Sequence, residues 1–156
     1  MHEFHGAARA LRRALVVLLL VGAGDVGFSC SGRADDAADR LRDLRIVSSA
    51  IRLEGQCLSI ACTPSLYYAA YARIVDTPDL TLDQILEAYD RALPAGRAYL
   101  SAVILKRDRA RGEEILRELT KSSAPVWKQY GCIVEVTTAG SVATFVLANN
   151  GLPGSW

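Results

Sequence analysis

The stretch TLDQILEAYDRALPAGRAYLSAVILKRDRARGEEILREL (Thr81–Leu119) decides the fold that this sequence predicts. Near its start, Leu82, Ile85, Leu86 and Tyr89 fall at positions i, i+3, i+4 and i+7, so they form one apolar stripe on a helix. A helix with such a stripe has to bury it against a neighbouring element. The stretch therefore predicts packed helices.

The boundaries of these helices can also be predicted. Thr81 and Gln84 have the spacing of a capping box, which marks the start of the first helix, and Pro94 with Gly96 predicts its end. A second helix is expected from about Arg97, and a third carries inward-facing Ile115, Leu116 and Leu119. Short turns make the three helices antiparallel neighbours, so we expect an all-α fold, a small antiparallel helical bundle.

Residues 1–30 have the layout of an export signal. Arg9, Arg12 and Arg13 form a basic segment. The apolar run that follows, 14–23, is shorter than the roughly 20 residues that a membrane span needs. We therefore predict a signal peptide over 1–30, with a transmembrane anchor as the alternative.

The end of this segment, Val26–Cys30, resembles the lipobox of bacterial lipoproteins, in which the cysteine after a small residue becomes lipidated. Ser29 is that small residue, whereas Gly27 stands where an aliphatic residue is usual. Lipidation of Cys30 and ordinary cleavage nearby both stay open. Either outcome predicts an exported protein of the bacterial cell envelope, in the periplasm or held at a membrane through a lipid on Cys30.

Loss of the leader would change the chemistry that remains. The chain has 18 basic and 17 acidic residues; three basic and two acidic ones precede Cys30, which leaves 15 of each. Such a neutral chain gives no reason to expect a nucleic-acid partner. Both histidines, His2 and His5, also precede Cys30, which argues against histidine-based catalysis and histidine-ligated zinc. We expect no metal site and no cofactor.

After the leader, we predict a short tether over 31–34, a single helical domain over 35–150 and a tail over 151–156. Apolar residues at helical spacing predict that the domain opens with a helix that ends at Gly55. The next helix is expected to begin with Thr63 and Pro64, and to bury Leu66, Ala69, Ala70 and Ile74.

Residues 132–148 admit two interpretations. Cys132–Thr138 is rich in β-branched residues and could form a hairpin with 142–147. Alternatively, a last helix capped by Ser141 ends at Asn150. We favour the helix, because an isolated hairpin is marginally stable and no other strand is predicted to extend it.

Cysteines are the most informative residues that remain. An exported chain meets an oxidising compartment, so Cys57, Cys62 and Cys132 are expected to form disulfides, joined by Cys30 if it is not lipidated. A Cys57–Cys62 bridge would close a small loop. A bridge from Cys132 to either partner would close about 70 residues and restrict the unfolded chain more, so we favour a bridge from Cys132.

Carboxylates are the main candidates for acid–base chemistry. A hydrolase could use Glu54, Asp76 or Glu87 as acid and base, but it would need them to converge in a concave pocket with raised pKa values. A binding protein would instead expose an apolar or aromatic patch. No nucleophile arrangement or phosphate-binding loop accompanies these carboxylates, so we predict that the protein is not an enzyme.

Three segments carry a resemblance to a known group of proteins. Leu93–Tyr99, the charged turn Arg107–Arg109 and the later Gly131–Val134 resemble a group of small, uncharacterised exported bacterial proteins, lipoproteins among them. The resemblance implies HEAT-like helical hairpins and carries no activity with it.

Together these observations predict an exported bacterial helical domain that binds another macromolecule in the cell envelope. A protein partner is expected, without nucleic acid, and with membrane contact only through a lipid on Cys30. An envelope immunity or inhibitor protein is one alternative, and a carboxylate-based hydrolase is another.

Overall fold

The computed structural model describes residues 31–59 and 61–152. The expected signal peptide, the candidate lipidation site Cys30 and most of the expected tail lie outside these residues. The chain divides into two compact units, 1–34 and 35–156, and the sheet and the hydrophobic core belong to the second. Within the described ranges, no helix combines the length and the apolar character that a membrane crossing requires.

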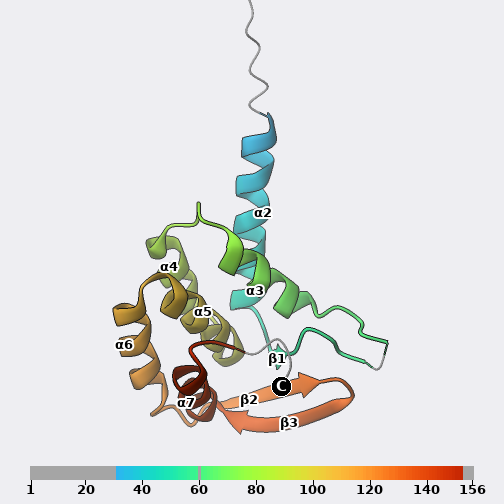
Figure 1. The fold of residues 1–156 in the computed structure, drawn as a ribbon, viewed down its shortest axis with the longest axis vertical. Helices are drawn as coiled ribbons and strands as arrows, with labels where there is room; N and C mark the ends of the chain where they lie inside the picture. Colours follow the sequence, from blue (N-terminus) through green and yellow to red (C-terminus); the bar gives the residue numbers. More distant parts are fainter. Residues whose placement is uncertain (1–30, 60, 153–156) are drawn as a thin grey trace, which may run out of the picture. The chain divides into compact units, whose positions relative to one another are not determined.

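The fold of the described residues is α+β, so the expected all-α bundle is wrong (Figure 1). Six helices and a three-stranded sheet are present in this part of the chain. In chain order the elements are α2 (Ser31–Ser48), β1 (Arg52–Glu54), α3 (Leu66–Asp76), α4 (Leu82–Arg91), α5 (Pro94–Arg107), α6 (Arg109–Leu119), β2 (Pro125–Tyr130), β3 (Ile133–Thr138) and α7 (Ala139–Asn149).

The sheet has the order β1-β2-β3, with β1 parallel to β2 and β3 antiparallel to β2. The hairpin β2–β3 is therefore not isolated, which removes the reason for expecting a purely helical fold. β1 is three residues long, too short for sequence periodicity to reveal. Leu53 of β1 and Val126 of β2 are buried and join the sheet to the helical core.

The region 132–148 is a strand followed by a helix. The expected last helix is confirmed, and it ends at Asn150, which adopts the left-handed conformation with φ of 53°. Its N-cap is Thr138 rather than Ser141, because the Thr138 side chain accepts a hydrogen bond from the backbone N–H of Ser141. The strand pairs with the preceding segment β2, and the suggested partner 142–147 lies in α7.

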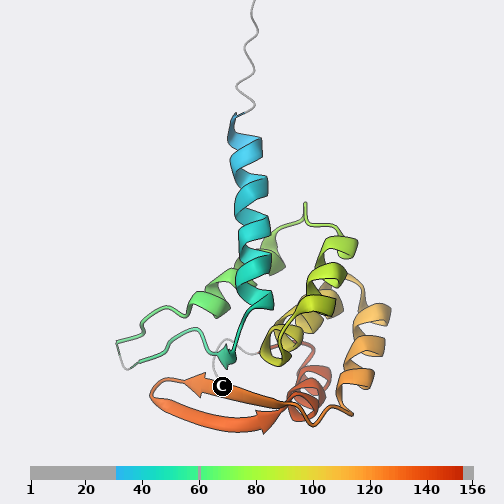
Figure 2. The same ribbon diagram turned by 180° about the vertical axis from the view of Figure 1, so that it is seen from behind.

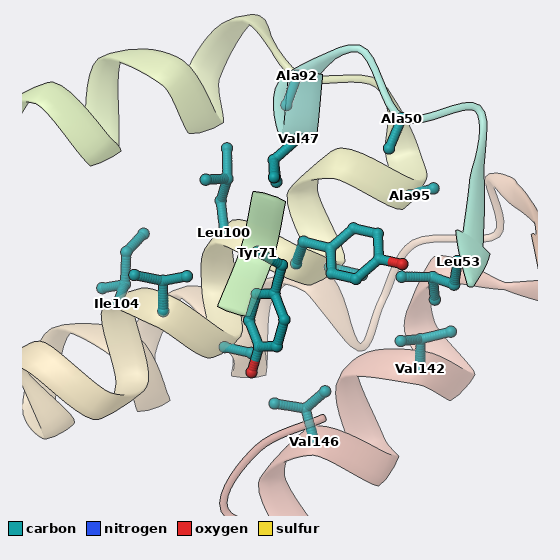
Figure 3. Packing of buried hydrophobic residues seen from close by; sticks show 14 of the residues in the cluster. Val47, Ala50, Leu53, Tyr71, Ala92, Ala95, Leu100, Ile104, Val142 and Val146 are labelled. Atoms are coloured by element: carbon teal, nitrogen blue, oxygen red, sulfur yellow. The ribbon is translucent and has the colours of Figure 1, made fainter. Parts of the chain in front are cut away.

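Helix α5 forms the centre of the core. It contacts α3, α4, α6, α7, β1 and β2, so it is buried on most sides. Figure 3 shows the Tyr71 ring within the surrounding cluster, with Leu100 of α5 and Val142 and Val146 of α7 around it. A helix that is apolar all round is expected at such a position.

Close backbone contacts explain two glycines in these helices. A Cβ on Gly96 would lie 2.6 Å from the carbonyl oxygen of Val47, and a Cβ on Gly112 would lie 2.3 Å from the Cα of Leu105. Gly96 therefore allows α5 to pack against the end of α2, and Gly112 allows α6 to pack against α5. The expectation that Gly96 helps to end the preceding helix is wrong, since it lies inside α5.

The helix starts agree only in part with the sequence. The capping box of Thr81 and Gln84 is confirmed, with both of its hydrogen bonds present. α3 is capped by Ser65 instead of Thr63, because the Ser65 hydroxyl accepts from the Tyr68 N–H. Leu66 is consequently in the first, exposed turn of the helix and is not buried as expected.

The first helix also differs from expectation at both ends. α2 already includes 31–34, the segment predicted as a tether. It ends at Ser48 and not at Gly55, because the Ser48 carbonyl accepts a hydrogen bond of 3.0 Å from the N–H of Leu93. A tertiary contact that no local sequence signal encodes therefore ends this helix.

Candidate interaction surface on the β-hairpin

One face of the β2–β3 hairpin carries exposed apolar side chains. In the strand register, Trp127 lies opposite Val136 and Gln129 lies opposite Val134. Directly opposed residues place their side chains on the same face, so Trp127, Val134 and Val136 are neighbours. Their side chains are 51%, 49% and 58% exposed. These three residues are called the hairpin surface below.

On the other face of the hairpin, polar side chains of β2 and β3 contact one another. The Lys128 ammonium lies 3.3 Å from the carboxylate of Glu135, and the Tyr130 hydroxyl donates a hydrogen bond of 2.9 Å to the same carboxylate. The hydrogen bond from Tyr130 and the charge of Lys128 lower the pKa of Glu135. Val126 lies on the same face as Lys128 and Tyr130, and its side chain is buried in the core. The opposite face, which carries Trp127, Val134 and Val136, is therefore the one that faces solvent.

The outer edge of the hairpin presents unpaired strand backbone. The residues that flank a two-residue turn exchange both of their backbone hydrogen bonds, and here these residues are Tyr130 and Ile133. The N–H and C=O groups of Val134 and Val136 therefore point away from β2. β3 is at the edge of the sheet, and within 31–59 and 61–152 no strand pairs with its outer side.

The tip of the hairpin lies beside the loop that follows β1. Gly131 has φ of +55°, as expected for the first central residue of a type II′ turn, and Cys132 follows it. The Gly131 N–H donates a hydrogen bond of 3.2 Å to the carbonyl oxygen of Cys57. Figure 2 shows that the closed end of the hairpin and this loop extend in the same direction, at one end of the sheet.

The cysteines pair differently from the favoured prediction. The disulfide joins Cys57 to Cys62, with 4.3 Å between their Cα atoms, and Cys132 is an exposed free thiol. Backbone hydrogen bonds from Leu58 to Thr63 and from Cys62 to Ser59 fold this loop tightly and bring the two cysteines together. The loop-entropy argument for Cys132 concerned the unfolded chain and left out this local geometry. A disulfide is typical of exported proteins.

Glu54 is buried in a structural cluster. Its carboxylate accepts hydrogen bonds of 2.6 Å from Arg52 and 2.6 Å from the Ser65 hydroxyl. The Tyr99 hydroxyl accepts from the backbone N–H of Glu54 at 2.7 Å and donates to its carbonyl oxygen at 2.9 Å. These contacts fix β1 against α5 and against the start of α3.

The other two candidate carboxylates belong to different elements. Asp76 is an exposed residue at the end of α3, and Glu87 lies on α4, where it pairs with Arg91 at 2.6 Å. Glu87 lines a groove of about 270 Å³ between α2 and α4, which includes neither Glu54 nor Asp76. Among the described residues, no cluster of side chains could hold a metal ion.

Two of the three tyrosines of α3 contribute to an aromatic cluster. Tyr71 is buried and packs against Tyr68 and Tyr99, with ring centroids 5.7 Å and 5.3 Å away. Burial raises the pKa of Tyr71 to about 12 and also raises that of Tyr99. Tyr67 is half-buried against the core. These rings are therefore packing residues and do not form an exposed binding face.

The sequence reasoning missed the hairpin surface. The sequence predicted no strand over 125–130, so the pairing that forms this surface could not be foreseen. The available signals were local and weak: 133–138 is rich in β-branched residues, and Gly131 is a turn residue. The segment Val126–Tyr130 has no alternation of apolar and polar residues that would mark it as a strand.

Comparison of the chain with protein-family models, with curated proteins and with solved structures gave no match.

Proposed function

We propose that this protein is an exported binding protein of the bacterial cell envelope, and that its β2–β3 hairpin binds an extended segment of a partner protein. The observation that carries the proposal is the combination, on one strand, of an open backbone edge and exposed apolar side chains. Both belong to Val134 and Val136. No group of converging acid and base residues competes with this surface in the part of the chain described.

The open edge offers recognition through the main chain. An extended peptide that lies along β3 would pair with the outward N–H and C=O groups of Val134 and Val136, in the mode called β-augmentation. Each such backbone hydrogen bond contributes about 1 kcal/mol net. Exposed edge strands in native proteins are usually protected by charge, proline or cover, whereas the outward positions of β3 are two valines.

The hairpin surface offers recognition through side chains. A strand added beside β3 places every second side chain next to Val134 and Val136, so apolar residues at alternate positions of the partner would be buried. Trp127 lies on the same face, one strand further in. Glu135 lies on the opposite face and is already paired with Lys128. The surface therefore favours an uncharged, alternating segment and gives no electrostatic preference.

A synthetic peptide with alternating valine and threonine tests this proposal when it is titrated into the full chain. Trp127 is half-exposed opposite Val136, one strand from the expected contact, so its large ring can report burial of this face through its fluorescence. The other tryptophan, Trp156, is replaced by phenylalanine to isolate the signal. We expect binding with a blue shift of Trp127 emission. A second peptide with N-methyl groups on alternate amides, which removes main-chain donors, should bind at least about tenfold more weakly.

Two variants distinguish backbone pairing at the edge of β3 from non-specific contact with exposed apolar side chains. Val136→Pro removes an outward N–H without disturbing the bonds to β2, and it should weaken binding of the unmodified peptide by at least about tenfold. Ile133→Ser removes an equally exposed apolar side chain from the other face and should leave binding unchanged. Equal affinity for the two peptides, or equal effects of the two variants, would refute strand addition at β3.

A further inference from the structure

We propose that Cys57, Cys62 and Cys132 form one thiol–disulfide exchange site, in which the Cys132 thiol can replace Cys62 as the disulfide partner of Cys57. The structure contains one disulfide and one free, exposed thiol in the described residues, and backbone contacts hold them in neighbouring segments. This inference is independent of whether the hairpin binds a partner.

The hairpin tip and the disulfide loop adjoin through the backbone. Gly131, the residue before Cys132, donates a hydrogen bond of 3.2 Å to the carbonyl of Cys57. The regular parallel pairing of β1 and β2 ends with Glu54 opposite Gln129, and beyond it the Gly131 N–H bonds to the carbonyl of Cys57 in place of that of Gly55. The backbone of Cys57 therefore lies next to the residue before Cys132. Cys132 is one residue, about 3.8 Å between Cα atoms, from the backbone contact with Cys57. The proposed pairing requires the turn 131–132 to bring the Cα atoms of Cys57 and Cys132 to the separation of about 4.4–6.8 Å that a disulfide spans.

The backbone contact of Gly131 with Cys57 indicates that Sγ of Cys57 is attacked, and the exposure of Cys62 favours it as the leaving thiolate. Cys57 is half-buried at the contact with Gly131, whereas Cys62 and Cys132 are exposed to solvent. The Cys132 thiolate attacks Sγ of Cys57, the Cys57–Cys132 bond forms, and the Cys57–Cys62 bond breaks. Cys62 leaves as a hydrated thiolate and takes a proton from water. One disulfide and one thiol are present before and after the step, so no oxidant or reductant is consumed.

The two disulfide pairings would restrain the tip of the hairpin to different degrees. With Cys57–Cys62 joined, the tip of the hairpin is held to the loop by hydrogen bonding. With Cys57–Cys132 joined, a covalent bond ties the tip to the end of β1, and Cys62 becomes the exposed thiol that an external disulfide can reach. Exchange would therefore move the reactive thiol from the hairpin to the loop.

Peptide mapping can distinguish the two pairings in the full chain. Trypsin leaves Cys57 and Cys62 together in the peptide 53–73, Cys132 in 129–156 and Cys30 in 14–33. The oxidised protein is incubated with a trace of thiol at mildly alkaline pH, quenched with acid, alkylated and digested without reduction. We expect two forms: alkylated 129–156 beside internally bridged 53–73, and a cross-linked 53–73/129–156 species with Cys62 alkylated.

Serine variants of the three cysteines measure how strongly each pair is favoured. In Cys62→Ser, a glutathione redox buffer should form the Cys57–Cys132 bond with an effective concentration at least about tenfold higher in the folded protein than in urea. In Cys57→Ser, the Cys62–Cys132 bond should be favoured less, because the hydrogen bond from Gly131 positions Cys57. Cys132→Ser should leave the Cys57–Cys62 disulfide intact and give no cross-linked peptide.

Three results would overturn the exchange site. One is an effective concentration in folded Cys62→Ser no higher than in urea. Another is bonding of Cys132 to a second molecule in place of Cys57. The last is wild-type protein that retains the Cys57–Cys62 pairing alone after prolonged incubation with thiol.

Discussion

Helix α5 and the β2–β3 hairpin use similar apolar residues for opposite purposes. In α5, ten residues are buried and the helix contacts most other elements of this unit. In β2 and β3, both fully described, Val126 alone is buried, and the valines of β3 face solvent. Stability therefore resides in α5 and its neighbours, whereas the hairpin is free to make contacts with other molecules. Substitutions in the two regions and a change of pH can test this division.

The largest difference is expected between truncations of a buried and of an exposed apolar side chain, one in each region. Leu100→Ala removes a fully buried side chain of α5 and should lower the free energy of unfolding by about 3 kcal/mol. Val134→Ala shortens an exposed side chain of the hairpin and should change it by less than about 0.5 kcal/mol. Urea denaturation followed by circular dichroism measures both. Similar losses for the two variants would contradict the division.

Two glycines extend the comparison to the backbone. Gly112→Ala places a Cβ 2.3 Å from the Cα of Leu105, so α6 has to move away from α5, at a cost of about 2 kcal/mol. Gly131→Ala has open space around it and suffers only from its φ of +55°, which costs about 1 kcal/mol. Thermal melting of the two variants should rank them in this order, and the reverse order would place the tighter packing in the hairpin.

Arg107 is expected to contribute a smaller amount to the free energy of unfolding, through hydrogen bonds to the end of α3. Its guanidinium donates hydrogen bonds to the carbonyl oxygens of Ile74 and Leu80, both at 3.0 Å, and so satisfies the end of α3. Arg107→Lys keeps the charge but cannot reach both carbonyls, so we expect a loss of about 1 kcal/mol. Arg109→Lys is the control, because Arg109 forms an exposed pair with Glu113 and should have little effect.

Alkaline pH should weaken the same core without any substitution. Burial raises the pKa of Tyr71 to about 12 in the folded protein, above its ordinary value of 10.0. The unfolded chain releases this proton first, so stability is full below about pH 10 and falls as the pH rises toward 12. Urea midpoints measured across this range should decline, and Tyr71→Phe should reduce the decline. An unchanged slope in Tyr71→Phe would show that Tyr71 does not titrate on unfolding.

Local sequence signals identified some helix boundaries, although they placed the N-caps of α3 and α7 two and three residues away from Ser65 and Thr138. The capping box at Thr81 and the helix end at Asn150 both depend on contacts within a few residues, and both are present. The outcome was different where a distant segment decides. Ser48 ends α2 because Leu93 donates to it, and β1 exists because β2 lies beside it.

The candidate surface shows the same limit. Val134 and Val136 were recognised as β-branched residues, but neither their face nor their exposure follows from composition. Their face depends on the register with Trp127, and their exposure depends on which side of the hairpin Val126 carries into the core. The favoured pairing of Cys132 was wrong for a related reason, since hydrogen bonds inside the loop set the distance between Cys57 and Cys62.

By itself, the sequence predicted the three central helices and favoured the helix that closes the described chain. Periodicity and capping operate within a few turns of a helix, and they are written in adjacent residues. Tertiary structure alone decided that β1 completes a sheet, that three apolar side chains of a hairpin face solvent, and that Cys132 lies beside a disulfide it does not join. Each of these depends on pairing between segments far apart in the chain, and single-sequence patterns do not encode such pairing.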